Sequence, residues 1–459
     1  MNFNDTIAAL STPIGKGGVA VIRICGDEAI SVAEKVFFPK SGKKLSELKP
    51  NFMTYGEIKA DGETVDDGLA DVFRAPRSFT GEDTVEINCH GGILVSRKVL
   101  YACFSAGARQ AYAGEFTRRA FVSGKMGLTQ AEALSSLLEA RNDEQLRLSR
   151  NNLSGKIKEK CDGIYDRLAG VLANIYAKVD FPDEDLASMT QDEAEKALSV
   201  LHAEIKKLSA TYKTGHAVME GVRTVICGKP NVGKSSLYNR LVGRDAAIVT
   251  DREGTTRDLL FETVTLGRVT LRLCDTAGIR KTEDEVEKIG VERAKRELEK
   301  AELVLAVFDG SVRIDEKDLE IIDDIKVIKA AKVAVINKYE EDSMIDESII
   351  KDNFDRIVRL SAKENRNIEE LVKTVGEIYI NEEIDTANDA VIINARQNAA
   401  LEKAAKHIES SLEALRAGFS ADVAGVDVEL AMSELSEMDG REVNEDIVSE
   451  IFSHFCVGK

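Results

Sequence analysis

The stretch RTVICGKPNVGKSSLYNRLV, residues 223–242, places a short apolar run before a glycine-rich loop and a helix-forming segment after it. Gly228, Gly233, Lys234 and Ser235 satisfy the pattern GxxxxGK[ST]. In this pattern backbone N–H groups surround phosphate oxygens, the lysine neutralises their charge, and the serine hydroxyl can bind magnesium. A glycine-rich turn could match by accident, but a strand before the loop and a helix after it favour a phosphate-binding site.

The residues around this loop alternate between apolar strand-like runs and helical segments. The runs between residues 221 and 378 are RTVIC, LRLCD, ELVLAVFD, KVAVIN and RIVRLS. Strands separated by helices predict a doubly wound parallel sheet, in which functional loops follow the carboxyl ends of the strands.

Four more motifs follow the loop along the chain. They are GTTRD (254–258), DTAG (275–278), NKYE (337–340) and SAK (361–363). Asp275 could reach the magnesium shell, and Thr256 could complete the metal site that Ser235 begins. Any one of these strings is weak, but five in order, four of them at a strand's carboxyl end, indicate a guanine-nucleotide GTPase. We therefore expect a Ras-like P-loop GTPase domain.

Two positions depart from the usual GTPase pattern. Glu340 stands where the base-reading aspartate is usual, and a glutamate keeps both acceptor oxygens but adds a methylene. Ile279 stands where signalling GTPases carry a glutamine that orients the attacking water, so another group must orient it. The acidic run TEDEVEK (282–288) lies close by, but its spacing alone is typical of a solvated surface.

Composition limits the classes of function. The chain has 459 residues, which predicts about three domains. Its 62 basic and 80 acidic residues give a net charge of −18, so any nucleic-acid contact must be a local patch. Seven scattered cysteines without metal-ligand spacing indicate reduced thiols. Without a signal-peptide pattern or an apolar run near about 18 residues, we expect a cytoplasmic protein.

The segments on either side of the GTPase motifs differ from each other. Residues 1–122 alternate β-rich runs with glycine-rich turns, which predicts an α+β domain. Residues 123–220 and 379–459 carry helical apolar stripes, so the GTPase domain over 221–378 is predicted to be inserted into a helical domain. The stripes are Leu128, Ala131, Leu134 and Leu138; Ile157, Cys161, Ile164, Leu168, Val171 and Ile175; and Leu401, Ala405, Ile408, Leu412 and Leu415.

Distinctive strings extend over the whole chain. They are DTIAALSTPIGKGGVAVIRI (5–24), SFTGEDTVEINCHGG (78–92), GEFTRRAF (114–121), DFPDED (180–185) and the terminal FCVGK (455–459). In combination with the GTPase motifs, they make the chain resemble the MnmE family, also called TrmE, of tRNA modification GTPases. The resemblance implies that GTP hydrolysis drives modification of C5 of the wobble uridine, of the aminomethyl or carboxymethylaminomethyl type, in certain tRNAs.

The resemblance also implies a potassium ion beside the phosphates. Asn231, Thr250, Thr255 and the backbone of Arg252 would hold this ion, whose charge would take the place of an arginine finger. Taken alone, Asn231 could equally serve only to cap the turn. Within the acidic run, the resemblance selects Glu287 as the catalytic residue that would orient water through an intermediary.

A one-carbon folate, 5-formyltetrahydrofolate or a relative, is the cofactor that the resemblance implies for the first domain. Its contacts would be Arg23, Glu86, Lys125 and Lys459, with basic groups for the glutamate tail and a carboxylate for the pterin edge. Read without the family, the first three are ordinary surface charges. Cys456 is assigned a catalytic role, but it could be a low-pKa nucleophile or a small apolar residue that packs the last helix.

The implied partners are a second copy of the chain, the flavoprotein MnmG, tRNA and GTP, with no membrane. A regulatory or ribosome-assembly GTPase switch is the alternative, although a switch has no need of a folate domain paired with a CVGK tail. The residues predicted to bind GTP are Asn231, Val232, Gly233, Lys234, Ser235, Ser236, Thr250, Thr255, Thr256, Asp275, Thr276, Ala277, Gly278, Asn337, Lys338, Glu340, Ser361, Ala362 and Lys363.

Overall fold

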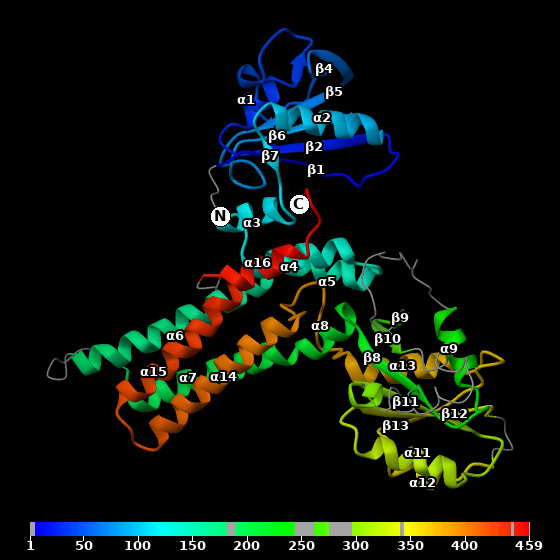
Figure 1. Ribbon diagram of the computed structural model, residues 1–459. Helices are drawn as coiled ribbons and strands as arrows, with labels where there is room; N and C mark the ends of the chain where they lie inside the picture. The colour runs from blue at the N-terminus through cyan, green and yellow to red at the C-terminus, as the bar shows by residue number, and fades with distance from the viewer. Residues whose placement is uncertain are drawn as a thin grey trace. The chain divides into compact units, whose positions relative to one another are not determined.

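The computed structural model describes residues 5–180, 189–243, 261–274, 296–339, 344–441 and 445–458 (Figure 1). Contacts between residues divide the chain into two compact units. The first consists of residues 1–135 and 436–459, and the second of residues 136–435. Within the described residues, no helix has the length and apolar character that a membrane span needs.

The first unit is built on a seven-stranded sheet with the order β3-β4-β5-β6-β2-β1-β7. Its neighbouring strands are antiparallel, except that β7 runs parallel to β1. Alternate residues of the central strands, such as Ile22, Ile24, Val85 and Ile87, are buried in one core with α1 and α2. The elements are β1 Ile7–Leu10, β2 Val19–Cys25, α1 Ala29–Glu34, β3 Phe37–Pro39, η1 Leu45–Glu47, β4 Thr54–Ala60, β5 Glu63–Phe73, β6 Thr84–His90, α2 Ile93–Ser105, β7 Arg109–Gln110, α3 Glu115–Val122, α16 Glu445–Ser453 and α4 Leu128–Glu139, of which the residues up to 135 belong here.

The last residues of the described chain belong to this first unit. Val457 forms an antiparallel bridge with Ala113, and the Ser11 hydroxyl donates to the Gly458 carbonyl over 3.1 Å. Phe452 and Phe455 of the α16 segment are buried with Leu128 of α4. Segments from both ends of the chain thus complete one core.

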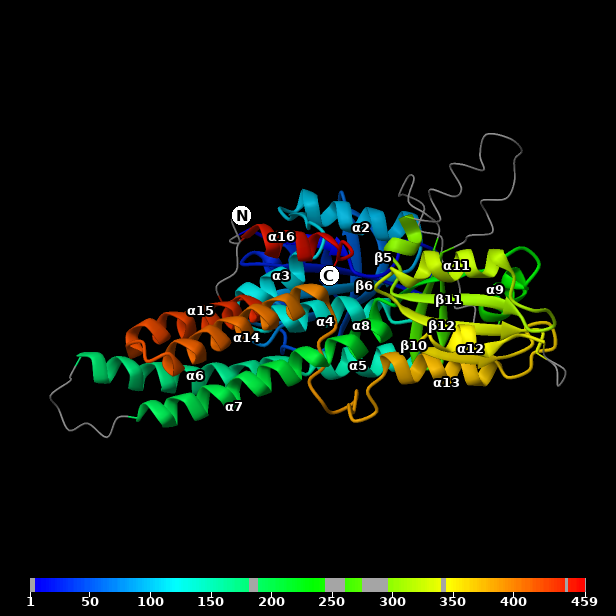
Figure 2. The same ribbon diagram turned by 90° about the horizontal axis from the view of Figure 1, so that it is seen from below.

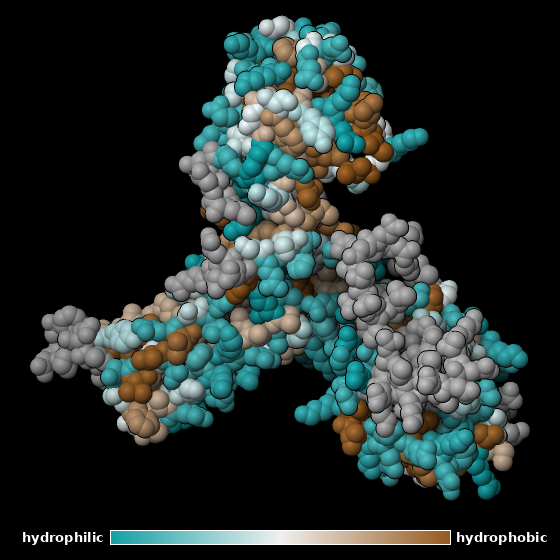
Figure 3. All heavy atoms as spheres, viewed as in Figure 1, coloured by the Kyte–Doolittle hydropathy of each residue, from teal (hydrophilic) through white to brown (hydrophobic). Residues whose placement is uncertain are grey.

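Hydrophobic residues also lie on the surface of the first unit (Figure 3). Val19, at the start of β2, is exposed and lies opposite His90, the last residue of β6. Ile93 and Leu94, which follow β6, are exposed as well. An apolar surface at this end of the sheet is typical of a site of interaction.

The second unit contains a six-stranded sheet with the order β13-β12-β11-β8-β10-β9. Its pairs are parallel except for β9, which joins β10 in an antiparallel hairpin. Along β11, Leu303, Leu305 and Val307 are buried in a cluster with α9 and α13, whereas Val304 and Ala306 are buried in a cluster with α11 and α12. Helices therefore cover both faces, and the predicted doubly wound sheet is confirmed. The elements are β8 Val222–Cys227, α9 Lys234–Val242, β9 Phe261–Leu266, β10 Val269–Cys274, β11 Leu303–Asp309, α11 Glu316–Lys326, β12 Ala331–Asn337, α12 Glu347–Lys351, β13 Arg356–Arg359 and α13 Ile368–Tyr379.

Long helices form the rest of the second unit, and Figures 1 and 2 show α6, α7, α14 and α15 side by side. The Tyr176 hydroxyl of α6 donates to Glu429 of α15 over 2.8 Å, and Ser411 of α14 donates to the Ala424 carbonyl. The two stripes predicted for α6 and α14 are buried along their whole length. These helices and their neighbours are α5 Asp143–Leu153, α6 Lys156–Asp180, α7 Gln191–Ala210, α8 Tyr212–Met219, α14 Ala395–Arg416 and α15 Ala421–Asp439, of which the residues up to 435 belong here.

One member of the predicted stripes does not follow the pattern. Leu128 and Ala131 of α4 are buried, but Leu138 is 48% exposed. Leu138 lies in the last turn of α4, one residue before its end, and lines a cavity. Periodicity predicts which face a residue occupies but not where the packed neighbours of that face end.

Candidate functional site

The loop between β8 and α9 has the backbone that its glycines predict. Gly228 has φ of 142° and Gly233, the N-cap of α9, has φ of 99°. A Cβ atom on Gly228 would lie 2.4 Å from the Val307 carbonyl oxygen, and one on Gly233 would lie 2.1 Å from Asn337 Nδ2. Both positions require glycine, because side chains would meet the neighbouring strand ends.

Lys234 directs its ammonium group back into this loop. Its Nζ donates to the carbonyl of Gly228 over 2.6 Å and to that of Lys229 over 2.7 Å. Lys229 itself binds Asp315 and Asp318 at the start of α11, over 2.8 and 2.6 Å. The two lysines therefore have different roles: Lys229 ties the loop to a helix, and Lys234 lies where phosphate charge would be neutralised.

Asn337, at the end of β12, joins three of the predicted motifs. Its Nδ2 donates to the Val232 carbonyl over 2.8 Å, and its Oδ1 accepts from the Ala362 N–H over 2.9 Å. Asn337 is buried, so these contacts hold the phosphate loop and the SAK motif in a fixed relation. The next residue, Lys338, binds Asp309 at the end of β11 over 2.5 Å.

The described residues bring together one part of the predicted nucleotide site. They include Asn231, Val232, Gly233, Lys234, Ser235, Ser236, Asn337, Lys338, Ser361, Ala362 and Lys363. The other predicted residues lie outside the described part of the chain, and their assignments stay predictions. These are Thr250, Arg252, Thr255, Thr256, Asp275, Thr276, Ala277, Gly278, Glu287, Glu340 and Lys459.

In the first unit, the sheet register pairs two of the predicted folate contacts. Arg23 of β2 is the cross-strand partner of Glu86 of β6, and their side chains form an ion pair at 2.8 Å. The Arg23 guanidinium also lies 5.7 Å from the ring centre of Phe79 and 5.5 Å from that of Phe116. These two aromatic contacts were missed from the sequence, because nothing in the spacing links Phe79 or Phe116 to β2.

The other two described candidates of this unit are Lys125 and Cys456. Lys125 Nζ donates to the Pro76 carbonyl over 3.0 Å, which ties it to the segment that carries Phe79. Cys456 has an exposed side chain, and its carbonyl accepts from the Gly114 N–H. The alternative in which Cys456 is a small apolar residue buried against the last helix is therefore wrong.

A buried charge network is centred on Arg119 of α3 in the same unit. The Arg119 side chain is 1% exposed and contacts Asp5, Glu82 and Glu115 at 2.6, 3.1 and 3.2 Å. Cys25 donates to Glu82 as well, and burial together with that carboxylate raises the pKa of its thiol to about 12. Cys25 is accordingly a structural thiol and no nucleophile at neutral pH.

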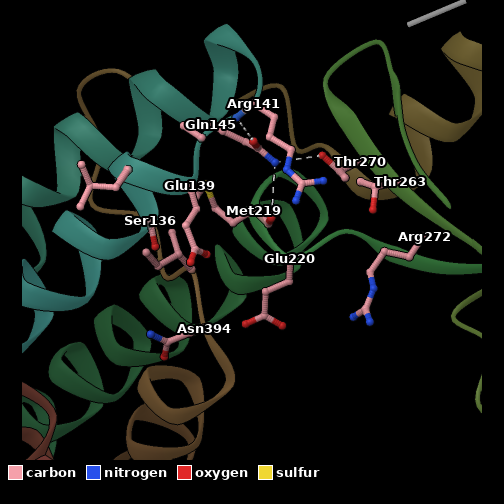
Figure 4. Close-up of a pocket in the computed structure, with 13 residues that line it drawn as sticks. Ser136, Glu139, Arg141, Gln145, Met219, Glu220, Thr263, Thr270, Arg272 and Asn394 are labelled. Atoms are coloured by element: carbon pink, nitrogen blue, oxygen red, sulfur yellow. Dashed lines mark hydrogen bonds between the residues drawn. The ribbon is translucent and has the colours of Figure 1, made fainter. Parts of the chain in front are cut away.

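A cavity of about 790 Å³ lies apart from the phosphate loop, in the second unit (Figure 4). Its walls come from the end of α4, the start of α5, the end of α8, β9 and β10. Gln145 and Thr270 lie at one side, where dashed lines mark their hydrogen bonds. No motif in the sequence predicted this cavity, because its lining residues come from several elements far apart in the chain and from the segment before α14.

A parallel sheet that carries a GxxxxGKS loop at one strand end and a buried asparagine at another defines a P-loop GTPase. A family model described as the MnmE helical domain matches residues 128–456, and one described as the GTP-binding protein TrmE N-terminus matches residues 6–125. The chain therefore belongs to the MnmE family of tRNA modification GTPases.

Full-length relatives agree with this assignment. The tRNA modification GTPase MnmE of Carboxydothermus hydrogenoformans is 40% identical over 462 residues, and that of Desulforamulus reducens is 39% identical over 463, with 100% of each chain covered. The solved structure of Era from Aquifex aeolicus is 29% identical, covers 40% of this chain and 66% of its own, and has a TM-score of 0.28. The predicted family, fold class and enzyme class, a GTP hydrolase, are confirmed.

Proposed function

We propose that this chain hydrolyses GTP to drive modification of C5 of the wobble uridine in certain tRNAs, with a one-carbon folate and the flavoprotein MnmG. The observation that carries the proposal is an intact phosphate loop, with Lys234 inside it and Asn337 buried against it, in a chain that matches MnmE relatives over its full length. The relatives' name, tRNA modification GTPase, favours this function over a regulatory or ribosome-assembly switch.

Hydrolysis in this proposal depends on charge placed beside the phosphates. Lys234 would neutralise the phosphate oxygens, and Ser235 and Thr256 would hold magnesium, with Asp275 reaching its shell. Ser235 fits a metal ligand because it lies in the first turn of α9, two residues after the N-cap Gly233. When bound, Mg²⁺ supplies charge that offsets the negative charge of the transferred phosphoryl group.

Potassium would be held by Asn231, Thr250, Thr255 and the backbone of Arg252, and Glu287 would orient water. Asn231 has φ of 65°, a left-handed conformation that asparagine tolerates better than most residues. The turn therefore gives Asn231 a second, purely conformational reason to be present. A glycine at this position would keep the conformation and remove the amide oxygen, which separates the two roles.

Folate would bind to the first unit, at Arg23, Glu86, Lys125 and Lys459. The Arg23–Glu86 pair and the exposed Phe79 ring beside it support this assignment, because an aromatic surface with a paired carboxylate and guanidinium suits a pterin. The exposed thiol of Cys456 belongs to the same unit, which supports a role for it in the modification reaction.

The partners in this proposal are a second copy of the chain, MnmG and tRNA, in the cytoplasm. The exposed apolar end of the first unit's sheet supports self-association. The net charge of −18 favours a local patch for tRNA over a broad basic surface. We further propose three domains, with residues 1–122, the helical halves 123–220 and 379–459, and the GTPase insert 221–378.

The test is an analysis of tRNA nucleosides from a strain that lacks the gene. We expect unmodified wobble uridines, restored by the wild-type gene and not by Lys234→Ala. Unchanged wobble uridines in the deletion strain would remove the modification function. Restoration by Lys234→Ala would show that GTP hydrolysis does not drive it.

A further inference from the structure

Three polar side chains at the start of α5 hold the β9–β10 hairpin. We call Asn142, Glu144 and Gln145 the α5 clamp. Asn142 donates to the Thr265 hydroxyl over 3.4 Å. Glu144 Oε1 accepts from Arg268 Nε and NH2 over 2.9 and 2.6 Å. Each of the three clamp residues thus has a partner in the hairpin, since Gln145 contacts Thr270.

The Gln145 contact is the buried part of the α5 clamp. Gln145 Nε2 donates to the Thr270 hydroxyl over 3.3 Å and to the Val218 carbonyl of α8 over 3.0 Å. The Thr270 hydroxyl in turn donates to the same Val218 carbonyl over 2.9 Å. Because these groups are buried, a shift of the hairpin against α5 would leave polar atoms without partners. The hairpin and α5 are therefore expected to move together.

The hairpin lies between two nucleotide motifs in the sequence. β9 begins at Phe261, three residues after the end of GTTRD, and β10 ends at Cys274, directly before DTAG. In GTPases such segments rearrange when the terminal phosphate is lost. If these flanking segments displace the ends of β9 and β10, the hairpin passes that displacement to the α5 clamp.

The α5 clamp also connects to the long helices. α5 ends at Leu153 and α6, of 25 residues, begins at Lys156. Asn152 of α5 donates to the Val391 carbonyl over 2.8 Å, in the segment that leads into α14. Thr263 and Arg272 of the hairpin line the cavity of Figure 4 together with Gln145 of the α5 clamp.

We infer that Asn142, Glu144 and Gln145 are positioning residues, which transmit displacement of the hairpin to the helices and so couple GTP hydrolysis to tRNA modification. This inference rests on the proposed function. Among the residues that the structure describes, the hydrogen bonds of the α5 clamp reach no nucleotide motif, so breaking it separates the two activities. The chain would still hydrolyse GTP, and the hydrolysis would no longer drive modification.

Arg268→Ala is the sharpest test, because the arginine is 41% exposed and its removal leaves the buried Gln145 contacts in place. Arg359→Ala is the matched control, since Arg359 also pairs with a glutamate, Glu347, and is 38% exposed. For each variant we would measure GTP hydrolysis by the purified chain and wobble-uridine modification in the deletion strain. The unfolding midpoint of each protein reports a purely structural defect.

We expect Arg268→Ala to hydrolyse GTP within about twofold of the wild type and to lose about fivefold or more of the modification. The exchanged pair Glu144→Arg with Arg268→Glu should restore modification, and Arg359→Ala should change neither activity. Normal modification by Arg268→Ala, an equal loss of both activities, or the same loss in Arg359→Ala would overturn the inference. If the wild-type gene itself restores no modification, the proposed function fails instead.

Discussion

The two sheets of the molecule present their candidate residues in different ways. In the parallel sheet of the second unit, the residues lie in loops at the ends of β8 and β12, each within a short continuous string. In the antiparallel sheet of the first unit, Arg23 and Glu86 lie within their strands and meet only through register. A site made of continuous loops can be recognised one motif at a time, whereas a site made by register exists only after the sheet has formed.

For the loop site of the parallel sheet, the largest effect is expected at Lys234. Lys234→Ala removes the ammonium that lies inside the loop, so we expect GTP hydrolysis to fall by about 100-fold or more. Single-turnover hydrolysis of radiolabelled GTP measures this loss. Lys326→Ala, at the exposed end of α11, is the control and should keep the wild-type rate. A variant at Lys234 that retained a tenth of the activity would mean that the loop is not the phosphate site.

Asn231 distinguishes ion binding from turn geometry within the same loop. If its amide oxygen holds potassium, Asn231→Gly should still bind nucleotide but lose the difference between rates in potassium and sodium chloride, a loss of about tenfold. The measurement is steady-state hydrolysis at equal ionic strength with magnesium present. A glycine variant that still responds to potassium would show that Asn231 serves the conformation of the turn alone.

Glu86→Gln tests the site that depends on register. The change keeps the shape of the side chain and removes the charge that pairs with Arg23, so binding of 5-formyltetrahydrofolate should weaken by about tenfold. Isothermal titration gives the affinity, and GTP hydrolysis should not change. Glu57→Gln is a matched control, because Glu57 of β4 in the same sheet pairs with Lys40, the residue that follows β3. Equal folate binding by both variants would remove Glu86 from the site.

The smallest effect is expected at His216, which connects α8 to the start of the parallel sheet. Hydrogen bonds to Glu220 and Glu302 raise the pKa of His216 from its usual value of 6.5 to about 9. A raised pKa stabilises the folded state fully below pH 6.5, and this stabilisation is lost as pH rises through about 9. His216→Gln should therefore lower stability by on the order of 1–2 kcal/mol at pH 6 and by little at pH 10.

Chemical denaturation at the two pH values measures the His216 effect. His454→Gln, which removes an exposed histidine, serves as the control. A His216 variant whose deficit is the same at pH 6 and pH 10 would mean that His216 contributes packing and no charge.

The sequence predicted the parallel sheet and its loops well for a physical reason. Positions 228 and 233 require glycine, because a Cβ atom there would clash with neighbouring atoms. The glycines of the sequence motif therefore report the shape of the loop directly. The apolar stripe along α6 was also predicted correctly, because a helix buries every third or fourth residue wherever a partner covers it. Leu138 lies in the predicted helix but is exposed, because that helix continues beyond the packed surface.

Other features could not be read from the sequence. Arg23 and Glu86 looked like ordinary surface charges, since only register places residues 63 apart in the chain opposite each other. The rings of Phe79 and Phe116 beside Arg23 were missed for the same reason. The α5 clamp is likewise a set of polar residues whose partners in the hairpin lie more than 120 positions away.

The closure of the first unit by residues 436–459 has a consequence for synthesis of the protein. Leu128 and Ala131 leave the ribosome long before Phe452 and Phe455, which bury them. At ~5–20 residues per second, translation of residues 136–435 takes on the order of 15 to 60 s, during which this apolar surface stays open. A stop codon just before Phe452 would remove both rings and leave this surface open permanently, so such a truncation should reach chaperones and proteases more often than its length suggests.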